Sequence, residues 1–233
     1  MKIQKYKKNF DYSYALGMAL TIELLKYHKN DVMFIYVHSS LTNEALDELK
    51  MYAGTIEIIL NDKIFNILSK KENCYVIGVF KKYETKITNE NHIVLHNPSN
   101  AGNLGTIIRS ATGFNVKNII IIRPGTDIFD PKVVRATMGA LFHINFKYYD
   151  TFEEYQNEFK DHNLYPFMLQ AKSSLKDVKF EKPFSLIFGN EATGLPREFL
   201  NIGHSVIIKH TNEIDSLNLP IACSIALFKS YDK

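Results

Sequence analysis

The feature that most constrains the fold is a series of short apolar runs that alternate with segments of helical periodicity. Residues 118–122 read NIIII, and residues 185–188 form a second run of the same kind. Such strands are buried on both faces, which is typical of parallel sheets that are covered by helices. The sequence therefore predicts an α/β fold, with a parallel sheet and helices on both of its faces.

The elements expected in the C-terminal two-thirds follow this alternation. Strands are expected over 92–96, 118–122, 144–148, 165–170, 184–188 and 206–208, and helices over 104–113, 131–141, 152–160 and 217–231. In such sheets, ligands bind beside the loops that leave the carboxyl ends of the strands. A functional site is therefore expected at those loops.

The N-terminal part of the chain has its own, smaller pattern. Helices are expected over 14–27, 42–52 and 62–68, and strands over 32–37, 56–60 and 75–80, with Thr42 or Asn43 as a helix cap. A polar, charged stretch follows. We expect a small α/β domain over 1–82, a linker over 83–91 and the larger domain over 92–233.

Composition narrows the partners and the compartment. The net charge of +3 permits a nucleic-acid partner without requiring one. Only four of the 28 basic residues are arginines, so each is a candidate for planar recognition, although Arg123 and Arg197 also fit a chance occurrence. No apolar run has the length of a membrane span, so a cytoplasmic protein is expected. Cys74 and Cys223 form no CxxC pair and the histidines show no ligand spacing, so no metal is expected.

Three loops of unusual composition follow predicted strands. They span residues 97–105, 189–196 and 215–220, and the first leads into a helix that carries Arg109. Each loop alone is adequately explained as a turn with a helix cap, because Asn, Ser and Gly are common there. The three together, in this order, are a more specific signal. The first loop lacks the Gly-x-Gly-x-x-Gly and Walker spacings, which disfavours a conventional nucleotide-binding enzyme.

The three loops resemble the motifs of the SpoU-type (TrmH-like) branch of the SPOUT methyltransferases. The residues that match are Asn103, Gly105 and Arg109 in the first motif, Gly189, Asn190, Glu191 and Gly194 in the second, and Ser216, Leu217 and Asn218 in the third. The segment 135–140 also resembles a block of that family. The resemblance covers the predicted larger domain.

This resemblance implies an RNA ribose methyltransferase that uses S-adenosylmethionine (AdoMet), with a deep trefoil knot at its C-terminal end. It implies a homodimer and a small substrate-binding domain at the N-terminus. The donor is expected to contact Gly189, Asn190, Gly194, Ile208, Lys209, Leu217 and Asn218. Two departures stand near these positions: Lys209 and His210 replace the family's Pro-Met, and Pro220 replaces a small residue. They bear on donor affinity more than on the fold.

The resemblance also implies the catalytic residues, namely Arg109, Asn103, Glu191, Ser216 and Asn218. The family assigns proton removal to the arginine, yet a guanidinium stays protonated in proteins. Two accounts stay open: Arg109 loses a proton in concert with a substrate phosphate, or it binds that phosphate and stabilises the alkoxide. Asn103 can cap its helix or face the substrate, Glu191 can organise a loop or a water, and Ser216 can also cap a helix.

The predicted reaction is methylation of a ribose 2′-hydroxyl, in ribosomal RNA more than in transfer RNA, because the N-terminal part resembles that of ribosomal-RNA modifiers. The alternative is a protein of the same fold that has lost catalysis and only binds RNA. A housekeeping role and a role in antibiotic resistance are both compatible with the sequence.

Overall fold

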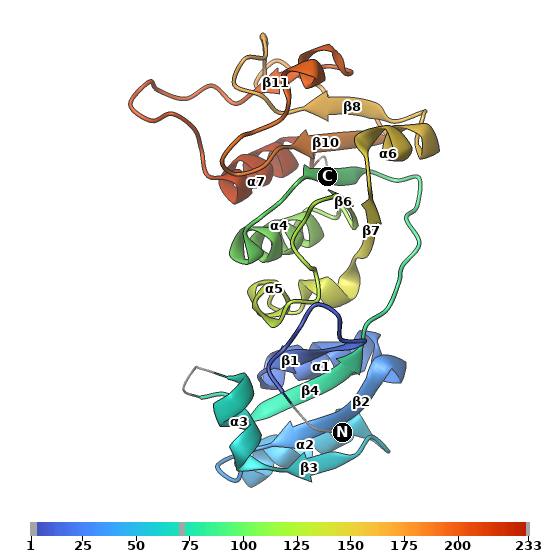
Figure 1. The fold of residues 1–233 in the computed structure, drawn as a ribbon, viewed down its shortest axis with the longest axis vertical. Helices are drawn as coiled ribbons and strands as arrows, with labels where there is room; N and C mark the ends of the chain where they lie inside the picture. The colour runs from blue at the N-terminus through green and yellow to red at the C-terminus, as the bar shows by residue number, and fades with distance from the viewer. Residues whose placement is uncertain (1–3, 70–72, 232–233) are drawn as a thin grey trace. The chain divides into compact units, whose positions relative to one another are not determined.

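The computed structural model describes residues 4–69 and 73–231, and the chain divides into two compact units (Figure 1). One unit contains Met1–Tyr83 and Asp127–His143, and the other contains Glu84–Thr126 and Ile144–Lys233. The division differs from the predicted domains in two respects: 127–143 was expected in the larger domain, and the predicted linker 83–91 is divided between the units after Tyr83. Among the described residues, no helix is both long and apolar enough to cross a membrane.

The first unit is a four-stranded mixed sheet with helices. Its elements are β1 (Tyr12–Leu16), α1 (Met18–Tyr27), β2 (Val32–Val37), α2 (Asn43–Ala53), β3 (Ile58–Leu60), α3 (Asp62–Leu68) and β4 (Val76–Lys81), with a 3-10 turn at Lys29–Asp31. The strand order is β1-β4-β2-β3, with β4 antiparallel to both neighbours and β2 parallel to β3. The Thr42 side chain caps α2, as predicted.

The predicted helix over 14–27 was wrong in its first four residues. Tyr14 belongs to β1, whose first four residues are all buried. Gly17 has a φ of 114°, a conformation that L side chains rarely adopt, and the helix begins after it at Met18. Strand and helix thus follow each other without a loop, so the apolar pattern runs through the junction.

The segment 127–143 contributes α5 (Pro131–Ala136) and a 3-10 turn (Ala140–His143) to the first unit. The predicted helix over 131–141 ends early because Met138 and Gly139 have positive φ values of 52° and 95°. Side chains join the segment to the rest of its unit: Ser13 donates to the Phe129 carbonyl, and His143 Nε2 lies 2.9 Å from Glu23 Oε2.

The second unit is built on a five-stranded sheet in the order β7-β6-β5-β10-β8. Its elements are β5 (His92–His96), α4 (Ala101–Gly113), β6 (Asn118–Ile122), β7 (Asn145–Tyr149), α6 (Phe152–Glu158), β8 (Asn163–Pro166), β9 (Ser173–Ser174), β10 (Phe184–Phe188), a 3-10 turn (Arg197–Asn201), β11 (Val206–Ile207) and α7 (Leu219–Ser230). All pairs in the five-stranded sheet are parallel, which confirms the predicted parallel sheet. The short strands β9 and β11 form a separate parallel pair, and β9 was not predicted.

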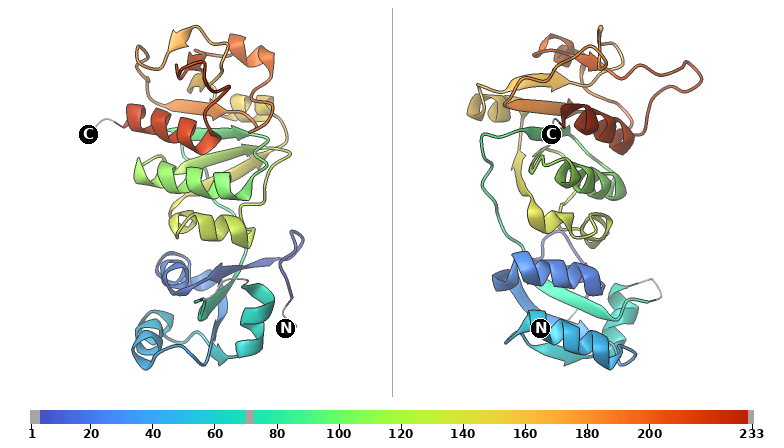
Figure 2. Two further views of the ribbon diagram at one scale, coloured as in Figure 1. Left: turned by 90° about the vertical axis from the view of Figure 1, so that its left-hand side faces the viewer. Right: turned by 180° about the vertical axis from the view of Figure 1, so that it is seen from behind.

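Helices cover both faces of this sheet (Figure 2). On one face, Val94, Ile120 and Ile187 pack in a cluster with Phe152 and Tyr155 of α6. On the other face lies α4, and α7 packs against both α4 and β10. The continuous apolar strands of the sequence are therefore explained by burial on both sides.

A chain of polar side chains lies buried within the second unit. His92 Nδ1 lies 2.8 Å from the Tyr155 hydroxyl, which is hydrogen-bonded to Ser185. The chain continues from Ser185 to His162 Nδ1 at 2.8 Å, and His162 Nε2 lies 3.0 Å from Asn89 Oδ1. Burial lowers the pKa of His92 from 6.5 to about 4 and also lowers the pKa of His162. Both rings are therefore neutral in the folded protein near neutral pH.

We expect this chain to make the second unit acid-sensitive. Below pH 6.5 the unfolded chain protonates His92 while the folded protein does not, so the free energy of unfolding falls between pH 6.5 and about 4. The loss due to His92 is about 3 kcal/mol at full extent. Urea unfolding at several pH values measures this loss. The His92→Asn variant should lose less stability over the same interval, and an equal loss in the two proteins would contradict the assignment.

Candidate active site

The first loop leaves β5 and leads directly into α4. Asn97 adopts a left-handed conformation with a φ of 54°, and Pro98 is buried behind it. The Asn100 side chain accepts a hydrogen bond from the Asn103 backbone N–H at 3.0 Å and so caps α4. The predicted start of this helix at 104 was therefore three residues late. Asn103 lies in the first turn and is not the cap, which leaves its side-chain amide available for another contact.

The second loop is a tight turn after β10. The Gly194 N–H donates to the Asn190 carbonyl at 2.9 Å, and Asn190 Oδ1 accepts from the backbone N–H groups of Ala192 and Thr193. A side chain at Gly189 would place its Cβ 2.1 Å from the carbonyl carbon of Gly194. Only glycine fits at position 189, because the obstacle is backbone that cannot rotate away.

Two side chains of the second loop fasten it to the first loop. Asn190 Nδ2 donates to the Asn97 carbonyl at 2.7 Å. Glu191 Oε2 accepts from the backbone N–H and the hydroxyl of Ser99, at 3.0 and 2.8 Å. Glu191 Oε1 accepts from the Asn100 N–H and from Asn103 Nδ2, both at 3.1 Å. The motifs that are separated in sequence thus meet at one carboxylate.

These hydrogen bonds also set the charge of Glu191. Partial burial raises the pKa of the Glu191 carboxyl, but the hydrogen bonds from Ser99 and Asn103 outweigh burial and hold the pKa below its usual range. The carboxylate is therefore ionised at neutral pH, and both its oxygens already accept hydrogen bonds. It is suited to organising the two loops and poorly suited to accepting a proton.

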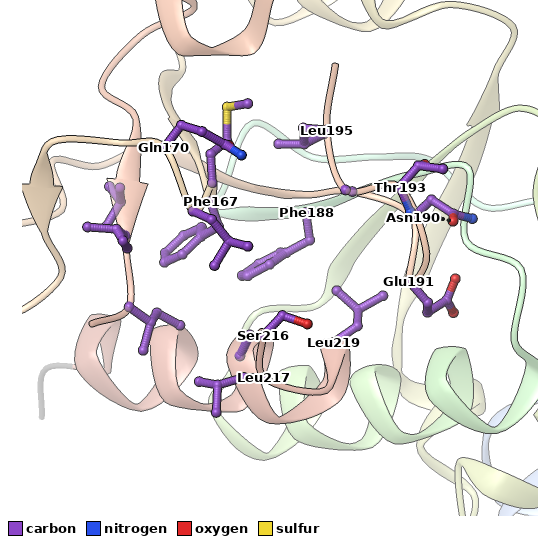
Figure 3. Close-up of a pocket in the computed structure, with 18 of the residues that line it drawn as sticks. Phe167, Gln170, Phe188, Asn190, Glu191, Thr193, Leu195, Ser216, Leu217 and Leu219 are labelled. Atoms are coloured by element: carbon purple, nitrogen blue, oxygen red, sulfur yellow. Dashed lines mark hydrogen bonds between the residues drawn. The ribbon is translucent and has the colours of Figure 1, made fainter. Parts of the chain in front are cut away.

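A cavity of about 260 Å³ lies beside the second loop (Figure 3). Its apolar wall includes the rings of Phe167 and Phe188, stacked with centroids 4.5 Å apart and planes 13° apart. Its polar rim comes from the second loop and from Ser216. Leu217 and Leu219 line it from the side of the third loop. Such a cavity suits a ligand with a flat ring system and polar ends.

The predicted residues divide between this cavity and positions outside it. Those that line the cavity are Gly189, Asn190, Glu191, Gly194, Ile208, Ser216 and Leu217. Asn103 reaches it through its hydrogen bond to Glu191. Lys209 and Asn218 are exposed and do not belong to the lining. The structure thus brings the second and third loops to one cavity.

The third loop ends at α7, which begins at Leu219 and not at 217 as predicted. Asn218 occupies the cap position without a side-chain hydrogen bond, so Ser216 is not a cap. Pro220 is the second residue of the helix, where its missing N–H costs no helical hydrogen bond. The departure at Pro220 is therefore compatible with the helix.

Arg109 lies away from this cavity. It is the ninth residue of α4, about 12 Å and more than two turns along the helix axis from Ala101. At about 100° per residue, it projects roughly 120° around the axis from Asn103. Its side chain is exposed, and it makes no hydrogen bond or ion pair with any described residue. The guanidinium is therefore available for a contact with another molecule.

Sequence reasoning did not find several residues of the site. They are Phe167 and Phe188 in the cavity and Ser99, which binds Glu191, whereas His210, expected beside the donor, does line the cavity. His210 Nδ1 lies 2.8 Å from the carbonyl of Thr211. Phe167 follows β8 directly, so its place at the carboxyl end of a strand was a usable signal. The predicted strand over 165–170 concealed it, because β8 ends at Pro166.

Among residues 4–69 and 73–231, no group of three or more His, Cys, Asp or Glu side chains could hold a metal ion. The expectation of a metal-free site stays a prediction.

The SpoU rRNA Methylase family model matches residues 90–228, which is more than half of the chain. The chain belongs to the SpoU rRNA methylase family. This result confirms the resemblance seen in the three loop motifs. The matched region includes all three loops of the site.

Two relatives of the family illustrate the match. An uncharacterized tRNA/rRNA methyltransferase of Synechocystis is 29% identical over 141 residues, which are 59% of this chain and 52% of that protein. The 23S rRNA (uridine(2479)-2′-O)-methyltransferase of Streptomyces viridochromogenes is 27% identical over 146 residues, 59% of this chain and 51% of that protein. The matched region thus spans about half the length of these relatives.

The fold resembles that of a solved structure over nearly the whole chain. The AdoMet-bound rRNA methyltransferase of Sinorhizobium meliloti superposes with a TM-score of 0.79 at 25% identity. The superposition covers 94% of this chain and 87% of that protein. A protein with a similar fold has therefore been solved with AdoMet bound.

Proposed function

We propose that this chain is an AdoMet-dependent RNA methyltransferase that methylates a ribose 2′-hydroxyl, in ribosomal RNA in preference to transfer RNA. The observation that carries the proposal is the meeting of the three motifs. The second and third loops line one cavity, and Glu191 ties the first loop to its rim. The names of the relatives, which include ribosomal-RNA and transfer-RNA enzymes, support an RNA substrate.

The residues of the cavity fit AdoMet. The stacked Phe167 and Phe188 rings and the aliphatic Leu195 and Ile208 suit the adenine ring, and the backbone of the second loop supplies polar groups. Gly189, Asn190, Gly194, Ile208 and Leu217 would hold the donor, while Lys209 and Asn218 would flank it. Bound there, AdoMet supplies an electrophilic methyl group with a neutral leaving group.

The chain's own residues would position the RNA for this transfer. On transfer, the ribose oxygen would take the methyl group, the thioether would leave with the electron pair of the carbon–sulfur bond, and the hydroxyl proton would pass to solvent water. Glu191 is a poor acceptor for that proton because its oxygens already bind N–H and O–H groups. The exposed Arg109 guanidinium is suited to binding a substrate phosphate and to stabilising the developing alkoxide.

We further propose that the chain acts as a homodimer and that its C-terminal end forms a trefoil knot. The exposed side chains of Ile221, Ile225 and Phe228 form a stripe on α7, with exposed fractions of 53%, 38% and 72%. A second copy could cover such an apolar face. Ser110, next to Arg109, hydrogen-bonds Ser224 on α7, so Arg109 lies near this stripe and could reach the partner's cavity. The second and third loops line one cavity, and the chain after them packs as α7 against β10 and α4. This path of the chain supports the knot.

Phe228→Glu is expected to convert the homodimer into a monomer, because it places a charge at the most exposed residue of the stripe. Sedimentation velocity measures the change in mass. Met51→Glu is the matched control, since Met51 is also an exposed apolar helix residue but lies on α2 in the first unit. A Phe228→Glu protein that stays dimeric would exclude α7 as the interface.

Calorimetry with AdoMet followed by mass spectrometry tests the function. We expect saturable AdoMet binding. We also expect that incubation of the protein and AdoMet with ribosomal RNA from cells that lack the gene produces a new 2′-O-methyl nucleotide. Failure to bind at millimolar AdoMet would favour an inactive RNA-binding protein. Methylation of transfer RNA alone would overturn the substrate preference and leave the reaction intact. A substrate-binding role for the first unit and a cytoplasmic location are further predictions of the same proposal.

A further inference from the structure

Arg123 stands at the carboxyl end of β6, next to the first loop. The Asn97 N–H donates to the carbonyl of Ile122 at 3.1 Å, so the first loop begins beside the residue that precedes Arg123. The Arg123 N–H donates to the carbonyl of Tyr149 at 2.9 Å, which fixes its backbone to the end of β7. Arg123 therefore lies at the edge of the sheet that carries the site.

The side chain of Arg123 is held in a defined position although it is half exposed. Its guanidinium carbon lies 4.8 Å from the centre of the Tyr148 ring, and its Nε lies 3.0 Å from Asp150 Oδ1. Neither of its Nη groups makes a hydrogen bond to a described residue. The stacked, planar group thus presents its outer edge to solvent.

Tyr148, whose ring lies under this guanidinium, is connected to the first loop by hydrogen bonds through Thr126. The Tyr148 hydroxyl donates to the carbonyl of Thr126 at 2.8 Å. The N–H and the hydroxyl of Thr126 both donate to the Pro98 carbonyl, at 2.9 and 3.0 Å. Pro98 precedes Ser99, which binds Glu191. The position of the guanidinium is therefore coupled to the loop that faces the substrate.

We propose that Arg123 binds a phosphate of the substrate RNA next to the methylated nucleotide. An ion pair as exposed as that between Arg123 and Asp150 contributes little to stability, so the fold alone does not explain the arrangement. In a chain that uses lysine for 24 of its 28 basic residues, a lysine would supply the charge alone. A guanidinium adds a planar edge that can donate two hydrogen bonds to a phosphate. Asp150 engages the Nε side and leaves that edge open.

This inference rests on the proposed RNA substrate, and its test uses the full chain with the RNA that it methylates. Arg123→Ala is expected to weaken RNA binding about tenfold and to lower the salt dependence of binding by about one phosphate contact. The KM for RNA should rise with kcat nearly unchanged, and calorimetry should show wild-type AdoMet affinity. The RNA affinity of Arg123→Lys should lie between those of the wild type and Arg123→Ala, since lysine keeps the charge and loses the planar edge.

Lys147→Ala is the matched control. Lys147 also lies over an aromatic ring, that of Tyr149 at 4.6 Å, and pairs with Glu158 at 2.7 Å, but it sits in the middle of β7. Its RNA affinity should be that of the wild type. The inference would be overturned if Arg123→Ala bound RNA with the affinity and salt dependence of the wild type, whatever its melting temperature. That result would leave the proposed function intact. Absence of RNA binding by the wild type would overturn the proposed function as well.

Discussion

Arg109→Ala is expected to lower methyl transfer by about a thousandfold or more, because it removes the charge that stabilises the alkoxide. The affinity for AdoMet should stay within about twofold of the wild type, since Arg109 does not line the cavity. Single-turnover assays and calorimetry measure the two quantities. Thr106→Ala, an exposed substitution on the same helix, should be neutral in both. Wild-type turnover in Arg109→Ala would remove the residue from the mechanism.

A mixture of two inactive proteins then tells which subunit Arg109 serves. If it reaches the partner's cavity, unfolding and refolding Arg109→Ala together with Glu191→Ala creates mixed dimers with one intact site. Half of the dimers are mixed and each has one working site of two, so about a quarter of the wild-type activity should return. If Arg109 serves its own subunit, every site lacks one residue and the mixture stays inactive.

Gly189→Ala is expected to abolish AdoMet binding, since its Cβ would lie 2.1 Å from the backbone of Gly194. Relieving the overlap requires the whole turn from 189 to 194 to move, and that turn forms the rim of the cavity. We expect a loss of roughly 3 kcal/mol or more in the free energy of unfolding, as for other substitutions that force backbone to shift. Calorimetry and urea unfolding provide the two readouts.

Gly113→Ala controls for the loss of a glycine. Gly113 is the last residue of α4, and a Cβ at this position would meet no atom within 4 Å, so alanine should be tolerated or slightly stabilising. AdoMet affinity should be unchanged in that protein. If Gly189→Ala bound AdoMet as tightly as Gly113→Ala, the second loop would not be the donor site.

The strands of the sheet were predictable because their signal is local. The bounds of β5, β6 and β10 agree with the prediction, since each is a short apolar run closed by polar or turn residues. Helix starts were less predictable. Asn100 and Asn103 are both suitable caps, and only the position of Glu191 decides which amide is free. That carboxylate comes from a loop about ninety residues away.

The composition of the cavity was predictable only in part. The second and third loops were found from their motifs, and the structure brings them together at one cavity. Phe167 was missed because its role depends on the stacking partner Phe188, a contact that periodicity does not report. The contact of Arg123 with Tyr148 likewise depends on the pairing of β6 with β7.

Because 127–143 belongs to the first unit, this unit cannot be exchanged between proteins as one continuous stretch of sequence. The chain passes between the units near residues 83, 126 and 143, so no single cut separates them. Ser13 donates to Phe129 and Glu23 pairs with His143 inside the first unit. Recombination at 84–91 alone would therefore combine an N-terminal part from one protein with the 127–143 segment of another, although both belong to one unit. Exchange of this unit between relatives should succeed only when 127–143 travels with it, and Glu23 and His143, which meet through their side chains, should change together.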